Sequence, residues 1–181
     1  MTLILFLLAV LAAGFLVFFA VAGFFIMPST TQRLGAYPKL RARWNQQHIA
    51  HFPKEIPADA TLQKFSHFQG FLQGGAHIQL RLQLPPERIQ ALHDEFARQC
   101  TTSFWGGSKY SHVSKHDGMP TTNFFTRGSS PLEFPSDYEL MIFDRVLTKS
   151  ERMPFMWNHG SSQGVAISVQ RHEIVYWAES W

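Results

Sequence analysis

Hydrophobic residues fill the first part of the chain almost without interruption. Leu3 to Met27 is a run of 25 residues, and no charged side chain occurs between Thr2 and Gln32. As a helix this run would be about 37 Å long, against a hydrocarbon core of about 30 Å. The pattern therefore predicts a single transmembrane helix, and we assign residues 1–28 to a membrane anchor.

A cleaved signal peptide is the alternative interpretation of this run. Such a peptide has a basic start, an apolar stretch of roughly 7–15 residues and a small-residue cleavage site. Only the cleavage pattern is present, as Ala20-Val21-Ala22, and the hydrophobic stretch continues beyond it to Met27. We therefore expect the anchor to be retained.

Basic residues follow the predicted span, and no acidic residue occurs before Glu55. These basic side chains are Arg33, Lys39, Arg41 and Arg43. By the positive-inside rule this distribution keeps the C-terminal side in the cytoplasm, with an extracytoplasmic domain as the alternative. The same four side chains are predicted to contact anionic headgroups at the membrane surface; a solvated linker is the other interpretation.

The next segment, residues 29–57, is predicted to form a neck helix and a linker. Pro38 suits the first turn of a helix that would run to about His51, with apolar residues four apart on one face. The two prolines of PKEIPADA then interrupt the helical spacing. We therefore start the soluble domain at residue 58.

Alternation with a period of two is clearest in AHIQLRLQL, residues 76–84, and is typical of a strand with one buried face. A helix is predicted over the following PPERIQALHDEFARQ. Two prolines precede it, and Ile89, Leu92 and Phe96 then form one apolar stripe. This helix is expected to pack on the sheet.

Four later runs rich in aromatic and branched residues predict further strands: NFFT, YELMIFD, GVAISV and EIVYWAE. The last two are separated by QRH, which suits a tight hairpin. Residues 101–120, rich in glycine and polar side chains, are predicted to be a long loop or a ragged hairpin. The order of elements predicts an α+β class, in which residues 58–181 form one small domain with a mostly antiparallel sheet and one packed helix.

Composition narrows the range of partners. There are 16 Lys plus Arg against 13 Asp plus Glu, and no basic stripe of the kind that binds nucleic acid. The one cysteine, Cys100, excludes an internal disulfide and fits a reducing compartment. We expect the lipid bilayer, or a membrane protein, to be the partner, and no nucleic acid.

Histidines are the main indication of catalysis. Nine occur, all after the predicted span. His112, His116 and Asp117 lie in the predicted long loop, and with His159 they would supply the imidazole and carboxylate ligands of an open zinc site. No H-E-x-x-H or paired C-x-x-C motif supports such a site. We therefore expect no cofactor, with a metal-dependent or other hydrolase as the alternative function.

GSSQG, residues 160–164, matches the G-x-S-x-G string of serine hydrolases, with Ser162 in the place of the nucleophile. A nucleophile elbow needs a helix after the serine, whereas a strand-like run follows here. A glycine-rich hairpin loop explains the string better.

The connection from Trp157 to Gly164 is instead predicted to be a recognition loop, held still by the C-terminal hairpin. Its candidate binding residues are Trp157, Asn158, His159, Ser161 and Ser162. The alternative is that these side chains satisfy the turn and the core. Taken together, the sequence predicts a single-pass membrane protein whose α+β domain is a non-catalytic binding or accessory module.

Overall fold

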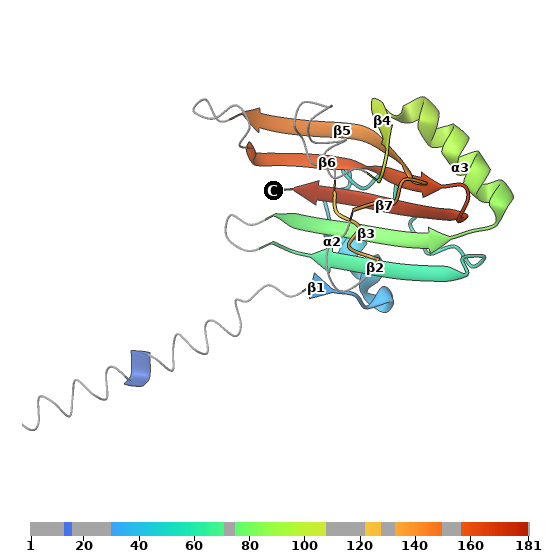
Figure 1. Ribbon diagram of the computed structural model, residues 1–181. Helices are drawn as coiled ribbons and strands as arrows, with labels where there is room; N and C mark the ends of the chain where they lie inside the picture. The colour runs from blue at the N-terminus through green and yellow to red at the C-terminus, as the bar shows by residue number, and fades with distance from the viewer. Residues whose placement is uncertain are drawn as a thin grey trace, which may run out of the picture.

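The structure is a computed structural model, and it describes residues 13–15, 30–70, 75–107, 122–127, 133–149 and 157–180. For residues 145–149 and 157–160 it describes the backbone. One antiparallel sheet of seven strands dominates these residues, in the order β1-β2-β3-β7-β6-β5-β4 (Figure 1). With its few helices, this sheet confirms the predicted α+β class.

The strands and helices follow one another in this order: β1 (Thr30–Thr31), the 3-10 helix η1 (Leu34–Ala36), α2 (Tyr37–Arg43), β2 (Leu62–Phe68), β3 (Ala76–Gln83), α3 (Pro86–Gln99), β4 (Thr102–Trp105), β5 (Glu139–Lys149), β6 (Trp157–Ser168) and β7 (Glu173–Ser180).

None of the helices in the described ranges is long and apolar enough to cross a bilayer. The predicted anchor, residues 1–28, lies outside the described residues except for residues 13–15, which are helical.

The most regular sequence patterns form the elements that they predict. The apolar residues of β3 and the next residue, Leu84, are buried on one face of the sheet. β6 and β7 pair as the predicted C-terminal hairpin, with Val165 opposite Tyr176 and Ile167 opposite Ile174. Helix α3 buries Ile89 and Phe96 against the sheet. These three predictions are confirmed.

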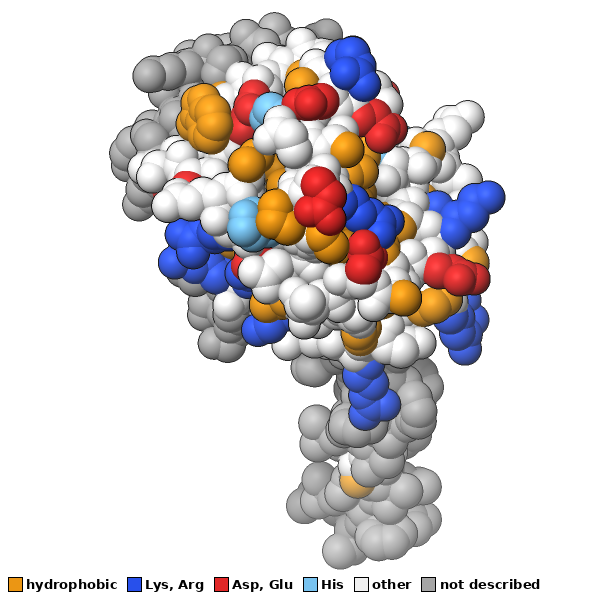
Figure 2. Space-filling model, turned by 90° about the vertical axis from the view of Figure 1, so that its right-hand side faces the viewer, with side chains coloured by type: hydrophobic (Ala, Val, Ile, Leu, Met, Phe, Trp, Pro, Cys, Tyr) orange, Lys and Arg blue, Asp and Glu red, His pale blue; other side chains and the backbone are white. Residues whose placement is uncertain are grey.

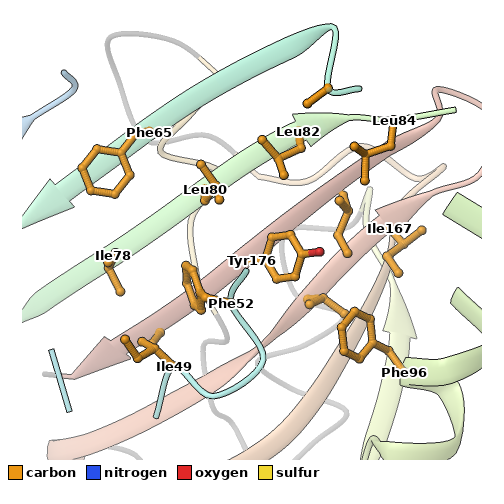
Figure 3. Close-up of a cluster of buried hydrophobic side chains, with 14 of the residues drawn as sticks. Ile49, Phe52, Phe65, Ile78, Leu80, Leu82, Leu84, Phe96, Ile167 and Tyr176 are labelled. Atoms are coloured by element: carbon orange, nitrogen blue, oxygen red, sulfur yellow. The ribbon is translucent and has the colours of Figure 1, made fainter. Parts of the chain in front are cut away.

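The main hydrophobic core lies between one face of the sheet and a layer made of α2, α3 and residues 45–60. Figure 3 shows Ile49 and Phe52 reaching over the sheet beside Tyr176, with Phe96 approaching from α3. Because apolar side chains from five strands, β2, β3, β5, β6 and β7, meet this layer, the face is closed along most of its width.

The segment before β2 is folded onto the sheet. Tyr37, Ile49 and Phe52 are buried in the core, and the Tyr37 hydroxyl donates a hydrogen bond to the carbonyl oxygen of Pro53. The predicted neck helix is shorter than expected, since α2 ends at Arg43. Gln46 Nε2 donates to three carbonyl oxygens in residues 41–44 and so satisfies the end of the helix.

The second face of the sheet is also covered. Residues 122–127 lie over it, held by Gln79, whose Nε2 donates to the Asn123 carbonyl oxygen at 2.9 Å. The Oε1 atom of Gln79 accepts from both the amide and the hydroxyl of Thr126, each at 2.9 Å. The expectation that β3 buries one face is therefore wrong, because a later segment covers its polar side.

One local prediction is also wrong. NFFT, residues 123–126, contains a turn and no strand, because Gln79 takes its backbone groups as hydrogen-bond partners. Within residues 101–120, the predicted long loop or ragged hairpin, Thr102–Trp105 forms the edge strand β4 on β5. Residues 108–120 lie outside the described residues.

Candidate functional site

A groove of about 510 Å³ opens on the helix-covered face of the sheet, between α3 and residues 47–53. Its floor comes from three neighbouring strands, through Phe143 of β5, Gln163 of β6 and Tyr176 of β7. Its walls are formed by Gln47, Ala50, His51, Pro53, Arg88, Leu92, Glu95, Phe96 and Gln99. Volumes of this size suit small ligands or a side-chain anchor.

Helical spacing explains why α3 forms one wall. The wall residues from Arg88 to Gln99 recur at intervals of three and four, so they share one side of the helix. Phe96 is buried at the base, while Arg88, Glu95 and Gln99 are exposed at the rim. The helix therefore gives the groove an apolar base and a polar edge.

His51 is fixed at the opposite wall. Its Nε2 lies 3.1 Å from the carbonyl oxygen of Trp177, and its ring packs edge-on against Phe143 with centroids 5.1 Å apart. Burial lowers the pKa of His51 to about 4, so the ring is neutral at pH 7. A neutral ring with an acceptor beside Nε2 carries its proton on that nitrogen.

The other polar groups at the floor of the groove are also uncharged. Burial raises the pKa of Tyr176 above its ordinary value, so its phenol keeps its proton. Gln163 Oε1 is buried and accepts no hydrogen bond from the residues that the structure describes. At the rim, Arg88 Nη1 contacts both carboxylate oxygens of Asp59 at 2.6 and 2.7 Å. The floor therefore suits a neutral group with hydrogen-bonding capacity, while the charged side chains of the lining, Arg88 and Glu95, lie at the rim.

The predicted recognition loop is a strand. Residues Trp157–Ser168 form β6, because the second half of β5 pairs with it as far as Lys149 opposite Trp157. Ser162 is buried, and its Oγ accepts from Trp177 Nε1 at 3.4 Å; Ser161 is half-buried. The side chains of Trp157, Asn158 and His159 lie outside the described part of the chain. The binding role of all five residues remains a prediction.

The role of the predicted zinc ligands also remains a prediction. His112, His116 and Asp117 lie outside the described residues, as does the side chain of His159. Among the side chains that the structure does describe, no group of three or more His, Cys, Asp or Glu residues is placed to hold a metal ion.

The four predicted membrane-surface residues divide into two sets. Arg33, Lys39 and Arg43 are exposed, and no described acidic side chain pairs with them. Arg41 is half-buried, and its Nη2 donates to the Phe52 carbonyl oxygen at 3.2 Å. Arg41 therefore stabilises the packed segment before β2.

Sequence reasoning did not find the serine–histidine contact on the second face. Ser66 Oγ lies 3.0 Å from His77 Nε2, and both residues are buried. The His77 ring is stacked on Phe125 with centroids 3.7 Å apart, and burial lowers the pKa of His77 to about 4. Because Phe125 covers the ring and no described carboxylate bonds to it, this contact is structural.

A second polar cluster lies beside α3. Glu139 accepts a hydrogen bond from Ser103 Oγ at 2.7 Å and lies 3.0 Å from His93 Nε2. The serine donates to the carboxylate and does not contact the histidine in the described structure, so the order needed to activate a nucleophile is absent from this cluster. On the α3 end of the molecule, acidic and basic side chains are interspersed with small hydrophobic areas (Figure 2).

No protein-family model, curated protein or solved structure matches this chain. A functional proposal therefore depends on the geometry of the groove and the pattern of the sequence.

Proposed function

We propose that this chain is a single-pass membrane protein whose α+β domain is a non-catalytic binding module. The domain holds a ligand, or a side chain of a membrane-protein partner, in the groove between α3 and residues 47–53. The groove is the observation that carries this proposal, because it joins a preformed cavity to neutral hydrogen-bonding groups.

The lining of the groove supports recognition of a neutral polar group. Gln163 offers a buried acceptor that has no partner among the described residues, and an atom of this kind gains a hydrogen bond when a donor enters. The neutral forms of His51 and Tyr176 keep charge away from the floor. A strongly charged group of a ligand would meet no counter-charge at the floor of the groove.

The anchor is supported by the sequence alone. A stretch of 25 apolar residues would span a bilayer with some tilt, and basic residues follow it. We place the domain in the cytoplasm on this distribution. The alternative function is a hydrolase that uses the His-rich segment. Its metal ligands would be His112, His116, Asp117 and His159. Metal analysis of the purified full chain tests this alternative.

Photocrosslinking in cells tests the groove. A photoreactive phenylalanine analogue at Ala50, which lines the groove, should form adducts that Leu92→Trp removes by narrowing the space. The same analogue at Gln90, on the exposed side of α3, is the matched control and should form none of these adducts. Identical adducts from both positions, or adducts at Ala50 that Leu92→Trp leaves unchanged, would contradict binding in the groove.

Alkaline carbonate extraction tests the anchor in the same cells. A retained span keeps the protein in the membrane pellet, whereas a peripheral or cleaved protein enters the supernatant. Release of the full chain by carbonate would contradict the anchored function.

A further inference from the structure

We propose that the exposed basic side of η1 and α2, defined by Arg33, Lys39 and Arg43, docks the domain onto anionic lipid headgroups. This inference rests on the proposed membrane anchor. The inference goes beyond the anchor because a docked domain lies on the bilayer in one orientation, whereas a domain that is only tethered by a linker has no fixed orientation.

Helix α2 has two distinct sides. Tyr37 and Leu40 face the core, and Arg41 turns inward to the Phe52 carbonyl oxygen. Lys39 and Arg43, which lie one turn apart, are exposed. The basic side chains that remain free for a membrane are therefore fewer than the sequence predicts: Lys39 and Arg43 on the side of α2 opposite the core, and the exposed Arg33 just before η1.

The helix is rigidly joined to the sheet. The Tyr37 ring meets Phe65 of β2 edge-on at 5.5 Å, and Trp44 meets His67 of the same strand at 5.6 Å. β1 pairs with β2 immediately before η1, so β1 and α2 both attach at this edge of the sheet (Figure 1). A lipid surface that binds the basic side chains would therefore orient the whole domain.

Charge favours a lipid surface as the occupant. No acidic residue occurs from Thr30 to Lys54, and no described carboxylate pairs with the three exposed basic residues. A single sign of charge without internal partners is the pattern that anionic headgroups attract.

Chain length keeps this surface near the membrane. Arg33 follows Met27, the end of the apolar run, by six residues. Six residues reach at most about 20 Å when fully extended. This is an upper limit, so the three basic side chains can come within contact of the headgroups. Each Lys or Arg at a membrane surface adds roughly five-fold to binding, and three add roughly a hundred-fold.

Docking would also fix the position of the groove. Residues 47–53, which form one wall, belong to the same packed segment as α2, through Ile49 and Phe52. The groove would then open at a constant height above the bilayer, where a ligand at the membrane surface or a juxtamembrane segment of a partner can reach it.

Quenching of a fluorescent label tests docking. The full chain with Cys100→Ser and Ala42→Cys carries an environment-sensitive dye on the exposed side of α2 and is reconstituted into vesicles containing headgroup-nitroxide lipid. We expect strong quenching when phosphatidylserine is present and weak quenching in phosphatidylcholine alone. Raising the salt from about 0.1 M to about 1 M shortens the Debye length from about 10 Å to about 3 Å and should remove the difference.

Two triple variants with equal loss of charge complete the experiment. Arg33→Gln, Lys39→Gln and Arg43→Gln should together abolish the effect of phosphatidylserine. Lys64→Gln, Arg98→Gln and Arg127→Gln, all at exposed positions elsewhere, should preserve it. Equal loss in both, or no effect of phosphatidylserine on the parent chain, would overturn docking while the vesicles still retain the protein. A chain that does not float with the vesicles would instead overturn the anchor itself.

Discussion

Glu179, close to the end of β7, is an acidic side chain in an unfavourable setting. It lies opposite His77 of β3 and Ser162 of β6 in the sheet register, on the face covered by residues 122–127. Its Oε2 atom is buried and has no hydrogen-bond partner in the described part of the chain. Burial raises the pKa of Glu179 from 4.5 to about 7, and a hydrogen bond with the Thr122 side chain offsets this in part.

This shift makes the stability of the protein depend on pH. Between about pH 4.5 and 7 the folded state keeps a proton on Glu179 that the unfolded state has lost, so the free energy of unfolding falls as the pH rises. The full shift corresponds to about 3 kcal/mol. In Glu179→Gln this contribution is absent. Urea unfolding of both proteins from pH 4.5 to 8 should show their stability difference growing in favour of the variant.

Comparison with the variant is needed because two histidines act in the opposite direction. The pKa values of His51 and His77 are lowered to about 4, so each adds stability as the pH rises from about 4 to 6.5. This contribution is common to both proteins and cancels in the difference. Parallel stability curves for the parent and Glu179→Gln would contradict the raised pKa.

At the scale of the elements, Gly164 allows β5, β6 and β7 to pack together. A Cβ atom at this position would lie 2.1 Å from the carbonyl oxygen of Met141 and 2.7 Å from the indole ring of Trp177. The Trp177 ring is wholly buried in the hydrophobic cluster on the second face of the sheet. It cannot move aside without disrupting the packing of that cluster. Gly164→Ala should therefore lower the free energy of unfolding by about 1–3 kcal/mol, measured by chemical unfolding with tryptophan fluorescence.

Gly35→Ala is the matched control for this substitution. A Cβ atom at Gly35 meets no atom within 4 Å, so alanine should cause no loss, or a gain of about 0.4–1 kcal/mol from the unfolded state. Equal stability of Gly164→Ala and the parent protein would show that the strands can separate at no cost, contrary to the packing described.

The elements that sequence patterns predicted well share one property: a single long pattern decides them. β3 alternates over its whole length, α3 keeps its apolar stripe, and β6–β7 has branched residues on both sides of a short turn. In these segments the local preference and the buried face agree. The prediction that β3 buries only one face is wrong because residues 122–127 cover its polar face. No local sequence pattern connects those residues to β3.

The remaining elements depend on contacts between distant segments. α2 ends early because Gln46 binds its last carbonyls, and the first half of β6 extends because β5 offers a partner. The groove could not be predicted for the same reason: its floor and walls come from residues 47–53, α3, β5, β6 and β7. The sequence drew attention to serine, histidine and glycine strings, whereas the described site consists mainly of glutamine, aromatic and aliphatic side chains.

For the whole molecule, the side of the membrane on which the domain lies decides which partners it can meet. Four basic residues, Arg33, Lys39, Arg41 and Arg43, follow the apolar run, and no acidic residue occurs among them. Arg41 contributes to this bias during insertion even though it is half-buried in the folded domain, because orientation is set before the domain has folded. We therefore predict a cytoplasmic domain.

Cysteine labelling in intact cells measures this orientation directly. In a Cys100→Ser background, Val169→Cys places a thiol in the exposed turn between β6 and β7. An impermeant maleimide should leave it unlabelled until the membrane is permeabilised, whereas Thr2→Cys, on the other side of the apolar run, should react in intact cells. Prompt labelling at position 169 with none at position 2 would place the domain outside. In that case the ligand of the groove would have to be an extracytoplasmic molecule, and the docking surface would face the outer leaflet, where fewer anionic lipids are available to bind it.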